Sequence, residues 1–375
     1  MLVNVSRLVD LFKELCLIDA PARAERECVD YVKALLTEMG LEVREDEAGE
    51  AIGGNAGNVI ARLKGNLEGA PKIFLSAHFD TVEPTAGLVI LDEDGIIKTD
   101  GTTILGADDK GGMAPAIEAI RILQETGAKH GDVYLIFCVA EEIGLLGADE
   151  VDFSEIDVDF GYVLDTGPPV GSFVTRTATH DKLDVVIRGK PAHAGKDPEC
   201  GISAIEVMSR AISKMKLGRI DPETTANFGL VQGGTAVNVV CPYVQLRGEA
   251  RSTNEETLDA QIDHMIECLT EATNHFGAKL EIDHRRHYRS YEIDDNEQVV
   301  QVAKRASEAL GFVPELRTTL GGSAANKFNA KGVKSIVVAT GMQKIHTHEE
   351  FIAVKDLIDT AELAYQLIIQ AAVQS

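Results

Sequence analysis

The chain has 375 residues, of which 45% are hydrophobic and 26% charged, a composition typical of a folded soluble protein. Acidic residues outnumber basic ones by 60 to 36, giving a formal net charge of −24. This charge repels phosphate backbones and anionic lipids, so nucleic acids and membrane surfaces are poor partners.

Six cysteines are scattered along the sequence without a Cys-x-x-Cys pair. This pattern indicates buried thiols in a reducing compartment rather than a disulfide framework. Arg7, Asp10 and Lys13 interrupt the first apolar positions, so no signal peptide is expected. No apolar run approaches the length of about 18 residues that predicts a membrane span. We therefore expect a cytoplasmic protein.

The first part of the chain predicts alternating helices and strands. Helices are expected where apolar residues recur at helical spacing, over residues 5–15, 24–39 and 113–124. Strands are expected over the apolar runs at residues 41–44, 58–64, 72–77, 132–140 and 162–165. The run at 132–140 is nearly continuous, as in a central strand covered on both faces. Asp94-Gly95 predicts a hairpin turn.

The pattern changes between residues 176 and 288. It predicts a strand, a helix, a strand, two alternating strands around residues 239–251, a helix and a strand, which fits a small sheet with two helices on one face. Because a single core rarely exceeds about 250–300 residues, we interpret this segment as an inserted domain. Residues 1–175 and 289–375 then form the larger domain, which closes with a helix, a strand and a helix.

Histidine and carboxylate side chains gather where strands of the larger domain end or helices begin. They are His78, Asp80, Asp108, Glu141, Glu142 and Asp165. Ligands bind at the carboxyl edge of such sheets. One histidine with several carboxylates and no cysteine suits catalytic zinc, manganese or cobalt better than structural zinc. A second histidine ligand is expected from His346 or His348.

At this point six motifs follow one another along the chain. They are His78-x-Asp80, the run Gly106-Ala107-Asp108-Asp109-Lys110-Gly111-Gly112, Glu141-Glu142-x-Gly144, Asp165, His193 and His346-x-x-x-Glu350. In these motifs the chain resembles the dinuclear zinc peptidases that include peptidase T, glutamate carboxypeptidase and the aminoacylases. It is most similar to the peptidase T-like, tripeptide aminopeptidase branch. The resemblance implies an α/β fold of zinc exopeptidase type, with a central mixed sheet, helices on both faces and an inserted ferredoxin-like α+β lid domain.

The resemblance also implies a set of ligands for two divalent ions, most simply zinc, with cobalt or manganese as alternatives. Asp108 would bridge the ions, His78 and Asp165 would complete one site, and Glu142 and His346 the other. The step from His346 to Glu350 favours His346 over His348. Three ligand carboxylates against two divalent cations leave one positive charge, which can hold a hydroxide at neutral pH.

Two further residues of the centre have implied catalytic roles. Asp80 would orient His78, since residues two apart on a strand face the same way. Glu141 would be the general acid/base, taking a proton from the water that bridges the ions and passing it to the leaving amine. Asp109 is expected to support the turn after Asp108.

The inserted domain carries its own implied positions. His193 would reach the active site of a partner subunit and stabilise the oxyanion, which requires a homodimer formed through the lid. Asn238 and Arg251 resemble substrate-binding positions, although Arg251 is equally suited to a structural ion pair. Ala324 departs from the family, because relatives usually carry Asp there.

The function that the resemblance implies is metal-dependent hydrolysis of short peptides, with release of the N-terminal residue of tripeptides. An alternative is an N-acyl amino acid deacylase or a glutamate-carboxypeptidase-like hydrolase, although Asp rather than Glu at position 165 leans toward aminopeptidases. A non-catalytic peptide-binding protein is a further alternative. It is disfavoured because Glu141, Asp165 and His346 are all present.

Overall fold

The computed structural model describes residues 2–373, and the chain divides into two compact units. The first unit comprises Met1–Thr175, Tyr291–Thr318 and Ser323–Ser375. The second comprises Arg176–Ser290 and Thr319–Gly322, so it runs past residue 288, where the inserted domain was expected to end. No helix among the described residues is long and apolar enough to cross a membrane.

The first unit is built on an eight-stranded mixed sheet with the order β1-β2-β6-β3-β7-β15-β8-β14. Its strands are β1 (Glu42–Glu45), β2 (Val59–Leu63), β3 (Ile73–His78), β6 (Val133–Cys138), β7 (Phe160–Val163), β8 (Ser172–Arg176), β14 (Glu315–Thr318) and β15 (Ser335–Val338). The central strands β6, β3, β7 and β15 run parallel, whereas β2 and β8 pair antiparallel beside them. The predicted central strand is β6, which is buried along its whole length.

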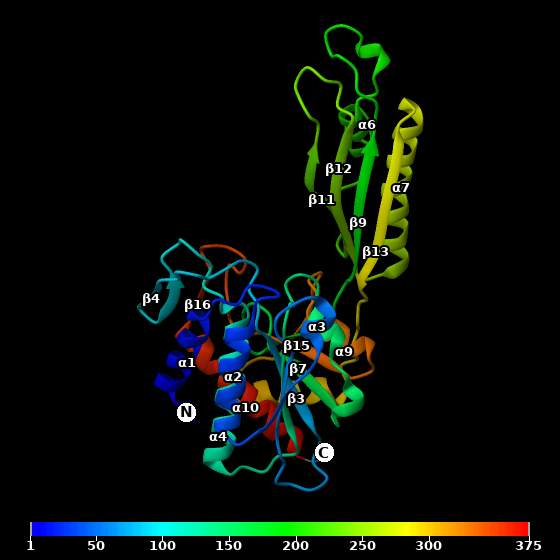
Figure 1. Ribbon diagram of the computed structural model, residues 1–375. Coiled ribbons are helices and arrows are strands. Elements are labelled where there is room, and N and C mark those ends of the chain that lie inside the picture. Colours follow the sequence, from blue (N-terminus) through cyan, green and yellow to red (C-terminus); the bar gives the residue numbers. More distant parts are fainter. Residues whose placement is uncertain (1, 374–375) are drawn as a thin grey trace. The chain divides into compact units, whose positions relative to one another are not determined.

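Helices cover both faces of this sheet (Figure 1). They are α1 (Val5–Leu17), α2 (Arg26–Glu38), α3 (Ala48–Ile52), α4 (Ala107–Thr126), α5 (Leu146–Glu150), η1 (Phe153–Glu155), α8 (Gln298–Ala309), α9 (Ala324–Ala330) and α10 (Val354–Ala372). Alternation along β3 separates two cores, because Leu75 packs in the core with α1, α4 and α10, whereas Phe74 contacts Phe328 of α9. The expected α/β architecture is confirmed.

A small three-stranded sheet lies beside this unit's main sheet, formed by β4 (Ile90–Glu93), β5 (Ile96–Thr99) and β16 (Phe351–Ala353). The predicted hairpin turn between β4 and β5 is confirmed. Asp94 and Gly95 both have positive φ, at 52° and 77°, as a two-residue hairpin turn requires. β16 brings the segment after residue 340 against this hairpin.

The second unit is a five-stranded antiparallel sheet with the order β10-β11-β12-β9-β13, packed against two helices. Its elements are β9 (Thr179–Arg188), η2 (Pro198–Cys200), α6 (Ala204–Ile212), β10 (Gly218–Asp221), β11 (Thr224–Gly233), β12 (Tyr243–Ser252), α7 (Glu255–Phe276) and β13 (Lys279–Tyr288). Without β10 this is the expected ferredoxin-like order. The two strands expected around 239–251 are wrong, since only β12 forms there. Pro242 cannot donate to a ladder, and the residues before it form a loop.

Gly161 in β7 offers a test of the first unit's packing, because a Cβ there would lie 2.1 Å from the Phe74 ring. We expect Gly161→Ala to lower the free energy of unfolding by about 1–3 kcal/mol, as overpacked cores do. Gly229→Ala is the matched control, since a Cβ at this exposed strand position approaches nothing closer than 3.4 Å. Both variants are unfolded with urea. Equal midpoints for the two variants would contradict this packing.

Candidate metal centre

Two groups of side chains in the first unit could each hold a metal ion. One is His78, Asp108 and Asp165, and the other is Asp108, Glu142 and His346. Within each group, one potential ligand atom from every residue lies within 4.8 Å of the others. Asp108 belongs to both groups. The structure therefore brings together all five residues that were expected to be metal ligands.

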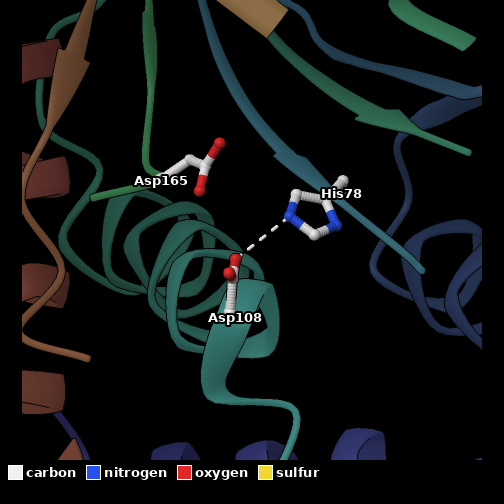
Figure 2. A group of neighbouring side chains, drawn as sticks. All are labelled: His78, Asp108 and Asp165. Atoms are coloured by element: carbon white, nitrogen blue, oxygen red, sulfur yellow. Dashed lines mark hydrogen bonds and ion pairs between the residues drawn. The ribbon is translucent and has the colours of Figure 1, made fainter. Parts of the chain in front are cut away.

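The sheet explains how residues far apart in sequence meet here. His78 ends β3 and Asp165 follows β7, and these neighbouring parallel strands end at the same edge. Asp108 comes from the start of α4, where its backbone and that of Asp109 depart from helical geometry. Figure 2 shows the Asp108 carboxylate directed at the His78 ring, with Asp165 beside them.

Each oxygen of the Asp108 carboxylate faces a different histidine. Oδ1 lies 3.1 Å from His78 Nε2, and Oδ2 lies 3.0 Å from His346 Nε2. In the absence of ions these hydrogen bonds outweigh the effect of burial and hold the pKa of Asp108 below its usual value. A carboxylate with one oxygen toward each group has the geometry of a bridging ligand.

Asp80 contacts both His78 and the turn that follows β6. His78 Nδ1 lies 2.9 Å from the backbone oxygen of Asp80 and 3.5 Å from its carboxylate, which leaves Nε2 facing Asp108. The Asp80 carboxylate accepts the backbone N–H groups of Glu141 and Glu142, at 2.8 and 3.0 Å. One buried carboxylate thus anchors a histidine and two glutamates of the centre.

A buried carboxylate oxygen without a hydrogen-bond donor indicates whether the site suits cations. Glu142 Oε1 is buried, lies 3.2 Å from His346 Nε2, and receives no hydrogen bond in suitable geometry. Burial raises the pKa of Asp165 well above its usual value, and the charge of Asp108 adds to the effect. Cations held between these carboxylates would satisfy the oxygens and remove the repulsion, so the residues fit two divalent ions.

Glu141 is buried beside these groups, and burial raises the pKa of its carboxyl group well above the usual value. The chain enters this turn through Ala140, whose φ is +50°. Glu25 stabilises the turn, because its Oε1 accepts the backbone N–H of Ala140 at 2.9 Å. Glu25 carries no motif and was not expected at the site, since its partner lies 115 residues away.

Asp109 and His348, the two neighbours of expected ligands, have other contacts. Asp109 is fully buried and accepts the backbone N–H of His78 at 3.3 Å, so it supports that strand end. His348 lies 2.6 Å from Glu83 and belongs to neither ligand group of the described chain. Ala324 is the first residue of α9, after the helix cap at Ser323.

The second unit holds the remaining predicted residues. His193 and Asn238 are exposed on neighbouring loops. The backbone oxygen of Asn238 accepts the backbone N–H of Ala194 at 3.0 Å. Arg251 forms two hydrogen bonds to Glu249, at 3.1 and 3.2 Å, and a third to the Leu320 oxygen. The structure therefore contains an ion pair at Arg251.

The model of the peptidase family M20/M25/M40 matches residues 74–370. Aminopeptidase PepT from Bacillus cereus ATCC 10987 has a solved structure with a TM-score of 0.90 and 41% identity over 100% of both chains. A tripeptidase from Staphylococcus aureus subsp. aureus mu50 gives a TM-score of 0.95 and 36% identity, again over 100% of both chains. Peptidase T of Enterococcus faecalis is 26% identical over 329 residues, 85% of this chain and 78% of that protein. These matches confirm the resemblance inferred from the motifs.

Removal of metal should destabilise the protein, increasingly so at higher pH. In the metal-free site, the hydrogen bond to Asp108 and the neighbouring carboxylate of Glu142 raise the pKa of His346 to about 10. Burial raises the pKa of Asp165 and of Glu141. The folded metal-free protein thus binds more protons than the unfolded chain above about pH 6.5, and its stability falls as the pH rises toward 10. The gap in Tm between zinc-loaded and chelator-treated protein should widen between about pH 6 and pH 9.

Two histidine variants provide the controls for this measurement. His346→Gln should lose most of the gap in Tm, whereas His348→Gln should retain it, because His348 pairs with Glu83 outside both ligand groups. A Tm indifferent to the chelator at every pH would exclude a metal site here.

Proposed function

Because the chain belongs to peptidase family M20/M25/M40 and is a metal-dependent peptidase, we propose that it is an aminopeptidase that releases the N-terminal residue of tripeptides. The observation that carries the proposal is that Asp108 belongs to two groups of side chains, each of which could hold a metal ion. The choice of substrate is supported by two solved structures that match the whole chain, one described as aminopeptidase PepT and the other as a tripeptidase.

We infer that His78, Asp108 and Asp165 hold one ion and that Asp108, Glu142 and His346 hold the other. Zinc is proposed, with cobalt or manganese as alternatives, since histidine and carboxylate ligands suit all three. When bound, the two ions supply the charge that activates a water molecule and polarises a peptide carbonyl. Asp80 fixes the orientation of the His78 ring.

Glu141 is proposed as the general acid/base. Its backbone N–H donates to the Asp80 carboxylate, and its buried side chain follows directly on the ligand-bearing turn next to Glu142. A carboxylate held at this place can accept a proton and return it. Glu141 would take the proton of the attacking water and donate it to the nitrogen of the departing peptide.

We propose that the second unit is a lid through which two copies pair. β10 pairs only with Thr224–Ala226 of β11, and the rest of β11 pairs only with β12 among the described residues. This half-paired strand carries Leu230 and Val231, which are 57% and 59% exposed. An unpaired edge with exposed apolar side chains is a surface that a second copy can cover.

Three lid residues receive proposed roles in such a dimer. His193, exposed on its loop, would stabilise the oxyanion in the active site of the other copy. Asn238, on the adjacent loop, would bind substrate. Arg251 would bind the carboxylate of the substrate. To do so, that carboxylate must displace Glu249, the present partner of Arg251.

Replacement of Glu141 separates catalysis from metal binding. Glu141→Gln should lower kcat by about 10²–10⁴-fold, because the amide cannot transfer the proton, while two ions remain bound. Glu150→Gln is the matched control, since Glu150 is exposed at the end of α5. Turnover and metal content are measured on the same preparations. Full activity of Glu141→Gln would remove Glu141 from this role.

Substrate blocking tests which end of the peptide is recognised. The zinc-loaded protein should cleave trialanine and its C-amidated form at the first bond, and should not cleave N-acetyltrialanine. Amine release is followed by chromatography. Cleavage of only the acetylated peptide would assign a deacylase or carboxypeptidase instead.

A further inference from the structure

Glu350 is a buried carboxylate outside the two ligand groups. It is 1% exposed, although Glu349 beside it is largely exposed and pairs with Lys344. Glu350 ends the loop that carries His346. Backbone hydrogen bonds between Gln343 and Phe351, at 2.9 and 3.1 Å, close the base of this loop.

The loop holds two residues in the left-handed region of backbone space. Lys344 has φ +53° and His346 has φ +62°, a conformation that is unfavourable for residues other than glycine. His346 therefore needs contacts that fix the loop. The backbone N–H of Glu350 donates to the backbone oxygen of Thr347 at 3.0 Å, which stabilises the turn between these two residues.

The Glu350 side chain contacts the segment that precedes α4. Its Oε2 accepts the backbone N–H groups of Leu105 and Gly106, at 2.9 and 2.7 Å. Its Oε1 accepts the backbone N–H of Asp108 at 2.9 Å. One carboxylate thus joins the loop of His346 to the backbone that presents Asp108, 242 residues earlier in the sequence.

This arrangement requires a carboxylate. Both oxygens act as acceptors for backbone donors, and an ionised carboxylate has two acceptor oxygens and no donor. A glutamine would place an NH₂ group against at least one backbone N–H. Aspartate keeps both acceptors on a shorter side chain.

We propose that Glu350 is a positioning residue that sets the distance between Asp108 and His346 and thereby the affinity for the ion these residues share with Glu142. The inference rests on the proposed metal centre. The hydrogen bonds of the Glu350 carboxylate go to backbone N–H groups, so it acts through the backbone of Asp108 and through the loop of His346. The other group, His78 and Asp165, shares only Asp108 with this segment.

The test is a zinc titration of the metal-free protein against a chromophoric chelator. The unmodified protein should bind two ions per chain. Glu350→Gln should bind one ion nearly as well, and the other about 10–100-fold more weakly, as is typical when a supporting partner of a ligand is lost. The visible spectrum of the cobalt-loaded variant should change accordingly. Glu349→Gln, the exposed neighbour, should match the unmodified protein in both measurements.

The outcomes separate this inference from the metal centre itself. Two ions bound with equal affinities in Glu350→Gln and in the unmodified protein would overturn the role of Glu350 and leave the centre intact. Lower Tm with unchanged zinc affinity would also overturn it, since a merely structural residue behaves so. Fewer than two ions in the unmodified protein would contradict the centre. If circular dichroism shows that Glu350→Gln is unfolded, the test passes to Glu350→Asp, which must then bind the second ion more weakly than the unmodified protein.

Discussion

Repulsion among buried carboxylates is the constraint on which the rest of this site depends. Asp108, Asp109 and Glu141 are buried and Asp165 is partly buried. Burial raises the pKa of Asp109, Glu141 and Asp165 in the absence of ions. The backbone N–H of His78, which donates to Asp109, and the two histidines that face Asp108 offset part of this cost. Two divalent cations can offset the remainder, because they replace the protons that the metal-free site would otherwise hold.

A second set of carboxylates positions the first. Asp80 accepts the N–H groups of Glu141 and Glu142, and Glu25 accepts the N–H of the residue before them. Each of these bonds joins residues that are at least 61 positions apart in the sequence. The parallel strands β3 and β7 deliver His78 and Asp165 to that edge. The positions of the side chains in the centre therefore depend on carboxylates that bind the backbone as well as on the ligand residues themselves.

The sequence predicts what is periodic or motif-bearing. Long elements such as β6, α7 and α10 follow from their apolar patterns. The five side chains that the structure brings together were named from the family motifs they belong to. Short elements such as β14 and α9 are missed, because tertiary contacts rather than local pattern stabilise them. Glu25 has no local signal, since its role depends on a backbone N–H 115 residues away. Glu350 appears in the sequence only as a spacing marker after His346, and its three partners emerge in the folded chain.

A bridge by Asp108 between two ions underlies the proposed chemistry. It is tested most directly by anomalous diffraction from zinc-loaded crystals, collected on both sides of the zinc absorption edge. We predict two peaks about 3.5–4 Å apart, the spacing of two-metal sites. One should lie between His78 and Asp165, the other between Glu142 and His346, and both should contact Asp108. A single peak, or two peaks that share no ligand, would contradict a bridging role for Asp108.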